Sequence, residues 1–161
     1  VYTNGFLFKE KENPRKLNIS EIKKIQEIEV CDYNNLKAGR DFTLSSGKTI
    51  QNSLLTLDPE KTMSYAYCSD TSYKPDIVEI IKKSDILYHE STFLSDKEDL
   101  AIKTRHSTAK QAAIIAKEAK VKKLILGHYS SRYKDISLFK KEAEEIFRNV
   151  ILAETGKIIS I

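Results

Sequence analysis

The chain has 161 residues, which is enough for one domain with a hydrophobic core. Its 40% hydrophobic content excludes a disordered polymer, and no run is apolar for long enough to span a bilayer. The net charge of +4 and the pI of about 8.9 are compatible with a nucleic-acid partner. They are equally compatible with a charge that only keeps the protein soluble. Cys31 and Cys68 match no zinc-ribbon or redox motif, so we expect two reduced, partly buried thiols in a cytoplasmic protein.

The first 60 residues predict short elements. Phe6–Phe8 reads as a strand, and Ser20 opens an amphipathic helix that carries isoleucines to residue 28 on one face and lysines on the other. Residues 41–50 alternate and turn at Ser-Gly, which indicates a hairpin. Leu54–Leu57 predicts a further short strand.

From Met63 onward the pattern changes to alternating strands and helices, which indicates an α/β layered fold. The expected strands are Met63–Cys68, Asp85–Tyr88, Lys122–Leu126, Val150–Leu152 and Lys157–Ile161. The expected helices are Pro75–Lys82, a long helix N-capped by Ser107, and Ile136–Arg148, with a polar loop before His106.

Three of the predicted strands end in chemically active residues. Asp70, His89-Glu90 and His128 follow them directly, and parallel neighbouring strands would bring these residues to one edge of the sheet. Aspartate and histidine suit zinc or manganese, and a two-metal site polarises a phosphoryl oxygen and generates hydroxide. Asp70 and His128 supply only two ligands, and a single histidine is also compatible with a packed or solvated side chain.

Two further groups predict acid catalysis and phosphate binding. His106 is a general-acid candidate, and Glu90 could orient it and keep it protonated. Arg132 could hold a phosphate oxygen, with Ser130 or Ser131 adding a hydroxyl. The alternatives are an exposed strand-end carboxylate and a surface arginine that pairs with an acidic neighbour.

Four motifs in this order resemble the C-terminal half of ribonuclease Z. They are Tyr-Cys-Ser-Asp70-Thr, His89-Glu-Ser-Thr, Arg-His106-Ser-Thr-Ala and Leu-Gly-His128-Tyr-Ser-Ser-Arg-Tyr. That family is the tRNA 3′-processing endonuclease of the metallo-β-lactamase superfamily. The resemblance implies the C-terminal half of an αββα sandwich, and a zinc enzyme that removes 3′ trailers from precursor tRNA.

The resemblance also implies roles for individual residues. Asp70 would bridge two zinc ions and His128 would bind one of them. Glu90 and His106 would protonate the leaving 3′ oxygen, and His89 would orient the strand end. The phosphate-side residues of the family are similar to Ser131 and Arg132.

In this family a basic arm that grips tRNA precedes the aspartate strand. Here it would span about Lys11 to Lys48, with Val30–Asn35 in place of the usual glycine-proline stretch. A solvated amphipathic helix and hairpin would have the same composition. The residues suited to phosphate contact are Lys16, Lys23, Lys24, Lys37 and Arg40.

The family's His-x-His-x-Asp-His motif would lie upstream of this region, and the sequence does not contain it. We therefore expect a C-terminal piece with an incomplete metal site, inactive by itself, whose bare sheet face favours a homodimer or other self-association. Two alternatives stay open: a superfamily phosphodiesterase acting on small or cyclic nucleotides, and a non-catalytic RNA-binding fragment.

Overall fold

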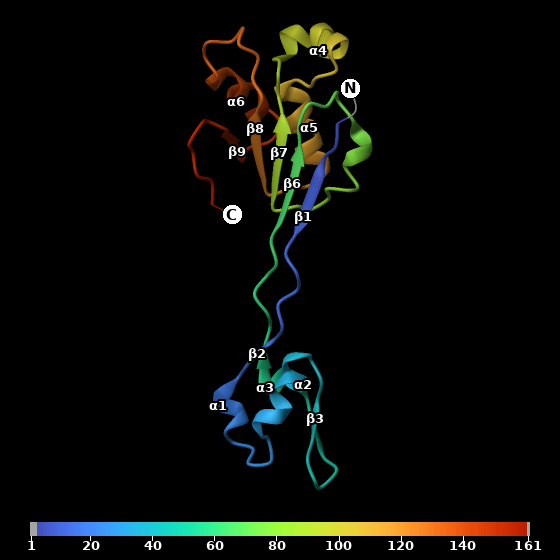
Figure 1. Ribbon diagram of the computed structural model, residues 1–161, viewed down its shortest axis with the longest axis vertical. Coiled ribbons are helices and arrows are strands. Elements are labelled where there is room, and N and C mark those ends of the chain that lie inside the picture. Colours follow the sequence, from blue (N-terminus) through green and yellow to red (C-terminus); the bar gives the residue numbers. More distant parts are fainter. Residues whose placement is uncertain (1–2, 161) are drawn as a thin grey trace. The chain divides into compact units, whose positions relative to one another are not determined.

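The computed structural model describes residues 3–160, and these form two compact units. The inserted unit is Lys11–Thr62, and the sheet unit is the rest of the described chain (Figure 1). The expected arm from Lys11 to Lys48 lies inside the inserted unit, which continues to Thr62.

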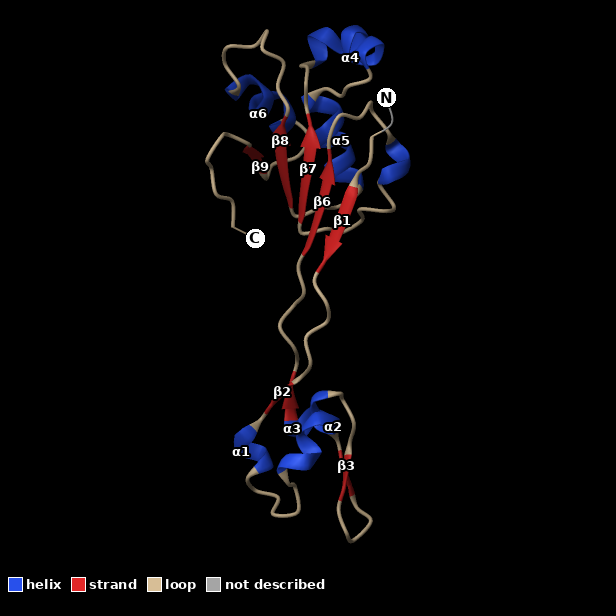
Figure 2. Cartoon of the chain, in the orientation of Figure 1, coloured by secondary structure: helices blue, strands red, loops and turns tan. Residues whose placement is uncertain are grey.

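The sheet unit contains a five-stranded sheet with the order β1-β6-β7-β8-β9 (Figure 2). The strands from β6 to β9 are parallel, and β1 is antiparallel to β6. The mixed α/β architecture confirms the predicted fold class. The strands are β1 (Phe6–Lys9), β6 (Ser64–Cys68), β7 (Ile86–Glu90), β8 (Lys123–Gly127) and β9 (Val150–Leu152).

One face of this sheet packs against α5 (Ala109–Glu118) and α6 (Ser137–Glu144). The strands alternate, so Ala66, Leu87 and Leu124 point into this core and are fully buried. The apolar side of α5 consists largely of alanines, which have no bulky side chains and therefore let the helix lie close to the strands.

The opposite face of the sheet carries aromatic rings. Phe6 and Phe8 are 54% and 57% exposed, and Phe8 stacks on Tyr65 with ring centroids 6.0 Å apart. Tyr67 stacks on Tyr88 at 4.8 Å. A row of partly exposed rings on one sheet face leaves a large apolar surface in contact with water.

The inserted unit has a small core of its own around Ile22, Ile28, Leu36 and Leu55. Its hairpin confirms the prediction for residues 41–50. The elements are β2 (Lys16–Leu17), α1 (Ile19–Ile22), a 3-10 turn at Val30–Asp32, α2 (Tyr33–Lys37), β3 (Phe42–Thr43), β4 (Thr49–Ile50), α3 (Asn52–Leu55) and β5 (Thr56–Leu57).

The helix expected from Ser20 to Ile28 is wrong beyond its first turn. After α1 the backbone continues as three-residue turns, in which the Ile25 amide donates to Ile22 and the Ile28 amide donates to Ile25. Three residues per turn keep Ile22, Ile25 and Ile28 on one side, so the same apolar spacing fits these tighter turns.

Other local predictions are also corrected. Only Pro75–Ile77 of the expected helix is regular, as a 3-10 turn, and Asn52–Leu55 is helical where a strand was expected from Leu54. The polar loop before His106 contains a 3-10 turn (Ser95–Lys97) and α4 (Glu98–Thr104). Thr108, rather than Ser107, N-caps α5.

At the C-terminus, residues 157–160 form no strand, and Ile161 lies outside the described residues. Cys68 is buried as expected, but Cys31 is exposed because it lies at the surface of the inserted unit. No helix within residues 3–160 is long and apolar enough to cross a membrane.

Candidate active site

The carboxyl ends of three parallel strands build the site. Cys68 of β6 pairs with His89 of β7, and Glu90 pairs with Gly127 of β8, so these strands end at the same edge. Asp70 and His128 follow with left-handed φ angles of 50° and 59°. The parallel order that was expected from the strand-and-helix pattern therefore brings Asp70, Glu90 and His128 together.

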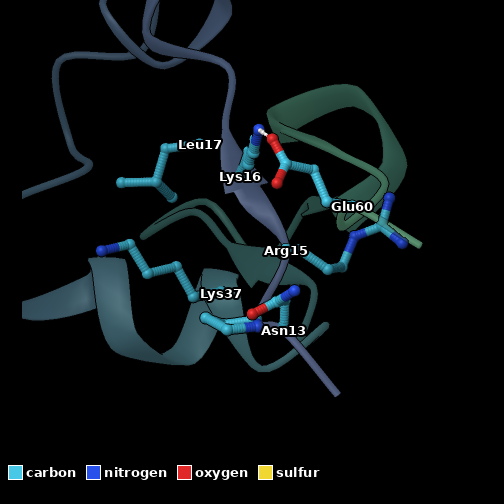
Figure 3. Close-up of a pocket in the computed structure, with 7 residues that line it drawn as sticks. Asn13, Arg15, Lys16, Leu17, Lys37 and Glu60 are labelled. Carbon is cyan, nitrogen blue, oxygen red and sulfur yellow. Dashed lines mark hydrogen bonds and ion pairs between the residues drawn. The ribbon is translucent and has the colours of Figure 1, made fainter. Parts of the chain in front are cut away.

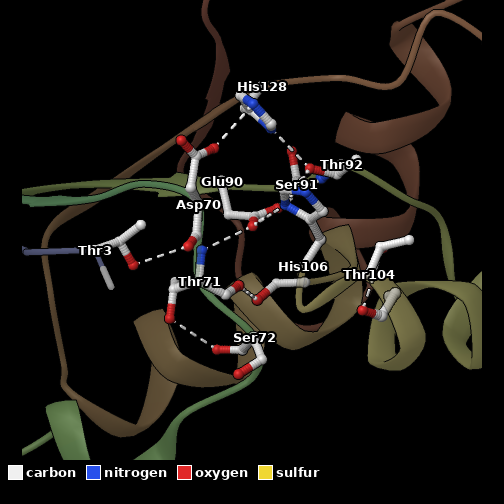
Figure 4. Close-up of polar contacts among 12 residues, drawn as sticks. Thr3, Asp70, Thr71, Ser72, Glu90, Ser91, Thr92, Thr104, His106 and His128 are labelled. Carbon is white, nitrogen blue, oxygen red and sulfur yellow. Dashed lines mark hydrogen bonds and ion pairs between the residues drawn. The ribbon is translucent and has the colours of Figure 1, made fainter. Parts of the chain in front are cut away.

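Asp70 and His128 meet at the open side of the site. Asp70 Oδ1 lies 2.9 Å from His128 Nε2, and their side chains are 49% and 43% exposed (Figure 4). Both residues line a cavity of about 390 Å³ together with His106 and Arg105. Solvent-accessible oxygen and nitrogen atoms beside a cavity are available to a ligand.

Glu90 lies beneath them and is fully buried. Its Oε1 accepts hydrogen bonds from His106 Nδ1 at 2.7 Å and from the Thr71 amide at 2.9 Å. Its Oε2 accepts from the Thr92 amide at 3.0 Å and from the Thr92 hydroxyl at 2.7 Å. Four donors fill the acceptor sites of a carboxylate, so Glu90 acts as a fixed anchor for its neighbours.

His106 is held between this anchor and the cavity. It follows Arg105, which ends α4 in a left-handed conformation with φ 61°. Its ring stacks on that of His128, with centroids 5.2 Å apart and planes 25° apart. Because Nδ1 donates to Glu90, the other ring nitrogen is the one left for chemistry.

His89 is buried in the sheet and does not line the cavity. Its Nδ1 donates to the backbone oxygen of Glu90 at 2.7 Å, and no described residue is a hydrogen-bond partner of its Nε2. Burial lowers its pKa, against the smaller opposing effect of Glu90. A neutral ring bonded to the strand end stiffens the backbone at Glu90.

The metal that the fold implies can be tested against these donors. Asp70, Glu90, His106 and His128 each offer one ligand atom, and these atoms all lie within 4.8 Å of one another. Since Glu90 is saturated and His106 donates to it, Asp70 and His128 are the two with accessible ligand atoms. Carboxylate oxygen and imidazole nitrogen fit zinc or manganese, but two ligands are fewer than such a site requires.

The residues expected to bind phosphate lie on the loop after His128. Ser131 and Arg132 are exposed, and the Arg132 guanidinium donates to the Ser130 hydroxyl at 3.3 Å. Among the described contacts, none joins Arg132 or Ser131 to the four-residue cluster. The loop itself is fixed, because the Tyr133 hydroxyl accepts a hydrogen bond from the Leu94 amide at 3.1 Å.

The basic residues of the inserted unit differ in their partners. Lys16 pairs with Glu60 at 2.5 Å and Lys24 with Glu21 at 2.7 Å, whereas Arg40 donates to Asn35 at 3.1 Å. No ion pair of Lys23 or Lys37 occurs among the described residues. Lys16 and Lys37 line a cavity of about 460 Å³ with Arg15 (Figure 3). Arg15 itself pairs with Asp58.

Sequence reasoning assigned no role to Thr92, yet its side chain is at the centre of the site. The hydroxyl contacts Glu90 Oε2 at 2.7 Å, His128 Nδ1 at 2.8 Å and His106 Nδ1 at 3.2 Å. Its position in the His-Glu-Ser-Thr motif, two residues after Glu90, was the available signal.

Comparison with known proteins extends these observations. Over 161 residues the chain is 45% identical to a ribonuclease Z of Phocaeicola vulgatus, covering all of this chain and 52% of that protein. Over 157 residues it is 43% identical to a ribonuclease Z of Bacteroides thetaiotaomicron, covering 98% of this chain and 49% of that protein. The chain thus spans about half the length of the curated relatives that it matches. No family model matches it.

Solved structures agree with the fold. The metallo-beta-lactamase fold protein YhfI from Bacillus subtilis matches 59% of this chain and 39% of its own, with a TM-score of 0.55 and 27% identity. A long form RNase Z from yeast matches 60% of this chain and 13% of its own, with a TM-score of 0.53 and 28% identity. This chain therefore corresponds, over its whole length, to the C-terminal half of ribonuclease Z, with a metallo-β-lactamase-type fold.

Proposed function

We propose that this chain forms one wall of a zinc-dependent endoribonuclease site that removes 3′ trailers from precursor tRNA. The observation that carries this is the Glu90–His106 pair, held at 2.7 Å beside Asp70 and His128 at one sheet edge. Similarity over the whole of this chain to about half of proteins named ribonuclease Z supports the substrate class. A cytoplasmic location is proposed on the same basis.

The residues divide the work of phosphodiester hydrolysis. Asp70 Oδ1 and His128 Nε2 would hold metal, which supplies Lewis acidity and a hydroxide nucleophile at neutral pH. His106, anchored through Nδ1 to Glu90, would give a proton from its other nitrogen to the leaving 3′ oxygen. The products would be a 3′ hydroxyl on the tRNA and a 5′ phosphate on the trailer.

Other parts of the chain are proposed to bind the substrate. Ser131 and Arg132 are proposed to contact phosphate next to the site. Lys16, Lys23, Lys24, Lys37 and Arg40 of the inserted unit are proposed to contact the tRNA backbone. The paired state of Lys16 and Lys24 means that their ion pairs must open or be shared when RNA binds.

The test is a cleavage assay on a 3′-extended precursor tRNA with the native protein that contains this sequence. Cleavage should require zinc or manganese, and it should fall about 100-fold or more in His106→Gln, because a positioned general acid contributes roughly 10²–10⁴-fold. Lys82→Gln changes a surface residue of the sheet unit and serves as the control. Absence of a metal-dependent product would contradict the proposal.

A second assay separates a tRNA enzyme from a phosphodiesterase of small or cyclic nucleotides. The Glu10 amide donates to Met63 at 3.0 Å, so residues 11–62 can be replaced by a short loop between ends that already pair. This deletion should abolish tRNA cleavage and spare a small chromogenic phosphodiester. Equal loss of both activities would argue against a tRNA-gripping unit.

For the chain by itself we propose an incomplete metal site and self-association as a homodimer or larger species. Only two accessible ligands are present in the described cluster, and the ring-bearing face with Phe6 and Phe8 is open. Metal analysis should find well below two ions per chain. Two tightly held ions would contradict the incomplete metal site. A clean monomer in light scattering would contradict self-association.

A further inference from the structure

The hydroxyl group of Thr92 contacts both the Glu90–His106 pair and His128. We propose that this hydroxyl is a positioning group that keeps a proton on Nδ1 of His128 and so reserves Nε2 for metal. The inference rests on the proposed function, in which His128 is a metal ligand, and it goes beyond the roles assigned to the acid and ligand residues.

The single proton of the Thr92 hydroxyl determines the direction of its hydrogen bonds. A threonine hydroxyl has one proton to donate and two lone pairs to accept with. An ionised carboxylate only accepts, so the 2.7 Å contact with Glu90 Oε2 takes the single proton of Thr92. The oxygen can then only accept from His128 Nδ1 at 2.8 Å, which requires a proton on that nitrogen.

The donor direction of Thr92 is fixed by its surroundings. Thr92 and Glu90 are both buried, and the Thr92 amide donates to the same carboxylate oxygen at 3.0 Å. Asp70, which faces the other nitrogen of His128, is half exposed and can turn toward water. The buried contact at Nδ1 therefore determines the tautomer, rather than the exposed contact at Nε2.

With Nδ1 protonated, the lone pair of His128 Nε2 faces Asp70 Oδ1 at 2.9 Å. Two acceptors at this distance repel each other unless a cation lies between or beside them. The hydroxyl of Thr92 thus turns a common surface pair of aspartate and histidine into a pair that favours a metal ion. Hydrogen-bond partners of ligating histidines act in this way in metal sites generally.

The experiment is nuclear magnetic resonance of the ¹⁵N-histidine-labelled, metal-free chain, recorded near pH 9, which is well above the ordinary pKa of histidine. The chain has three histidines, and His128→Gln assigns the signal of interest. In the wild type, His128 should carry its proton on Nδ1. In Thr92→Val, which keeps the shape and removes the hydroxyl, the proton should move to Nε2; Thr92→Ser should restore the wild-type pattern.

The other two histidines and a distant substitution provide controls. His106 donates to Glu90 and His89 donates to a backbone oxygen, so both should keep Nδ1 protonated in Thr92→Val. Thr43→Val, the same change in the inserted unit, should leave all three rings unchanged. An Nε2 proton on His128 in the wild type, or an unchanged His128 in Thr92→Val, would overturn the inference. Because the measurement involves no RNA cleavage, its failure can be distinguished from a failure of the nuclease proposal.

Discussion

Asp70 and His128 share a left-handed backbone conformation, and their side chains meet at 2.9 Å. Such φ angles are uncommon outside glycine, although Asp and His adopt them more readily than most residues. Each angle occurs within two residues of the end of a strand, where it turns the side chain toward the other and toward the cavity. Backbone strain is thus located at the two residues of the cluster whose donor atoms are accessible.

This strain predicts a difference between two variants that both remove the carboxylate. Glycine tolerates φ 50° and alanine does not, so Asp70→Gly should have a free energy of unfolding about 1 kcal/mol higher than Asp70→Ala. Chemical denaturation of both variants measures this difference. Equal stabilities would show that the turn relaxes once the side chain is lost.

Glu90→Gln should destabilise the sheet unit, because an amide NH₂ would face donors that the carboxylate now satisfies. We expect a loss of about 1–3 kcal/mol in the free energy of unfolding, measured with urea. Glu79→Gln changes a surface residue and should stay within about 0.5 kcal/mol of the wild type. A Glu90→Gln protein as stable as this control would mean that the carboxylate is not the anchor.

Asp85, which lies outside the candidate site, should make the stability of the chain depend on pH. Burial raises its pKa, but hydrogen bonds from Lys122 and Ser64 outweigh this and hold the pKa at about 2. Since the folded pKa is below the unfolded value, the stabilisation is complete above about pH 4 and is lost as the pH falls toward 2. The stability gap between wild type and Asp85→Asn should therefore narrow from pH 7 to pH 3 in urea unfolding. A constant gap would contradict this assignment.

Gly127 should not tolerate a side chain. A Cβ atom at this position would lie 2.4 Å from the Tyr88 hydroxyl oxygen and within 2.8 Å of two ring carbons. Gly127→Ala should cost about 1–3 kcal/mol through overpacking. In a Tyr88→Leu background the cost should shrink, because the ring atoms are gone, and a double-mutant cycle measures this coupling. Additive effects would exclude the contact as the cause.

The sequence alone predicted which strands end at the candidate site and which residues follow them. Alternating strands and helices after Met63 required a layered sheet, and residues placed directly after parallel strands must share one edge. Ordered motifs around Asp70, Glu90, His106 and His128 were sufficient to indicate the family. Local periodicity did not determine the type of secondary structure, because the spacing of the isoleucines from Ile22 to Ile28 fits tight turns as well as a helix.

Only the tertiary structure decided which contacts each group makes within the cluster. Saturation of Glu90 by four donors, and the position of Thr92 between two histidines, depend on strands and loops that are distant in sequence. Hydrogen bonds are short-ranged and directional, so no spacing rule predicts which donor takes which lone pair. The folded backbone alone makes Glu90 an anchor, and leaves Asp70 and His128 accessible at the cavity.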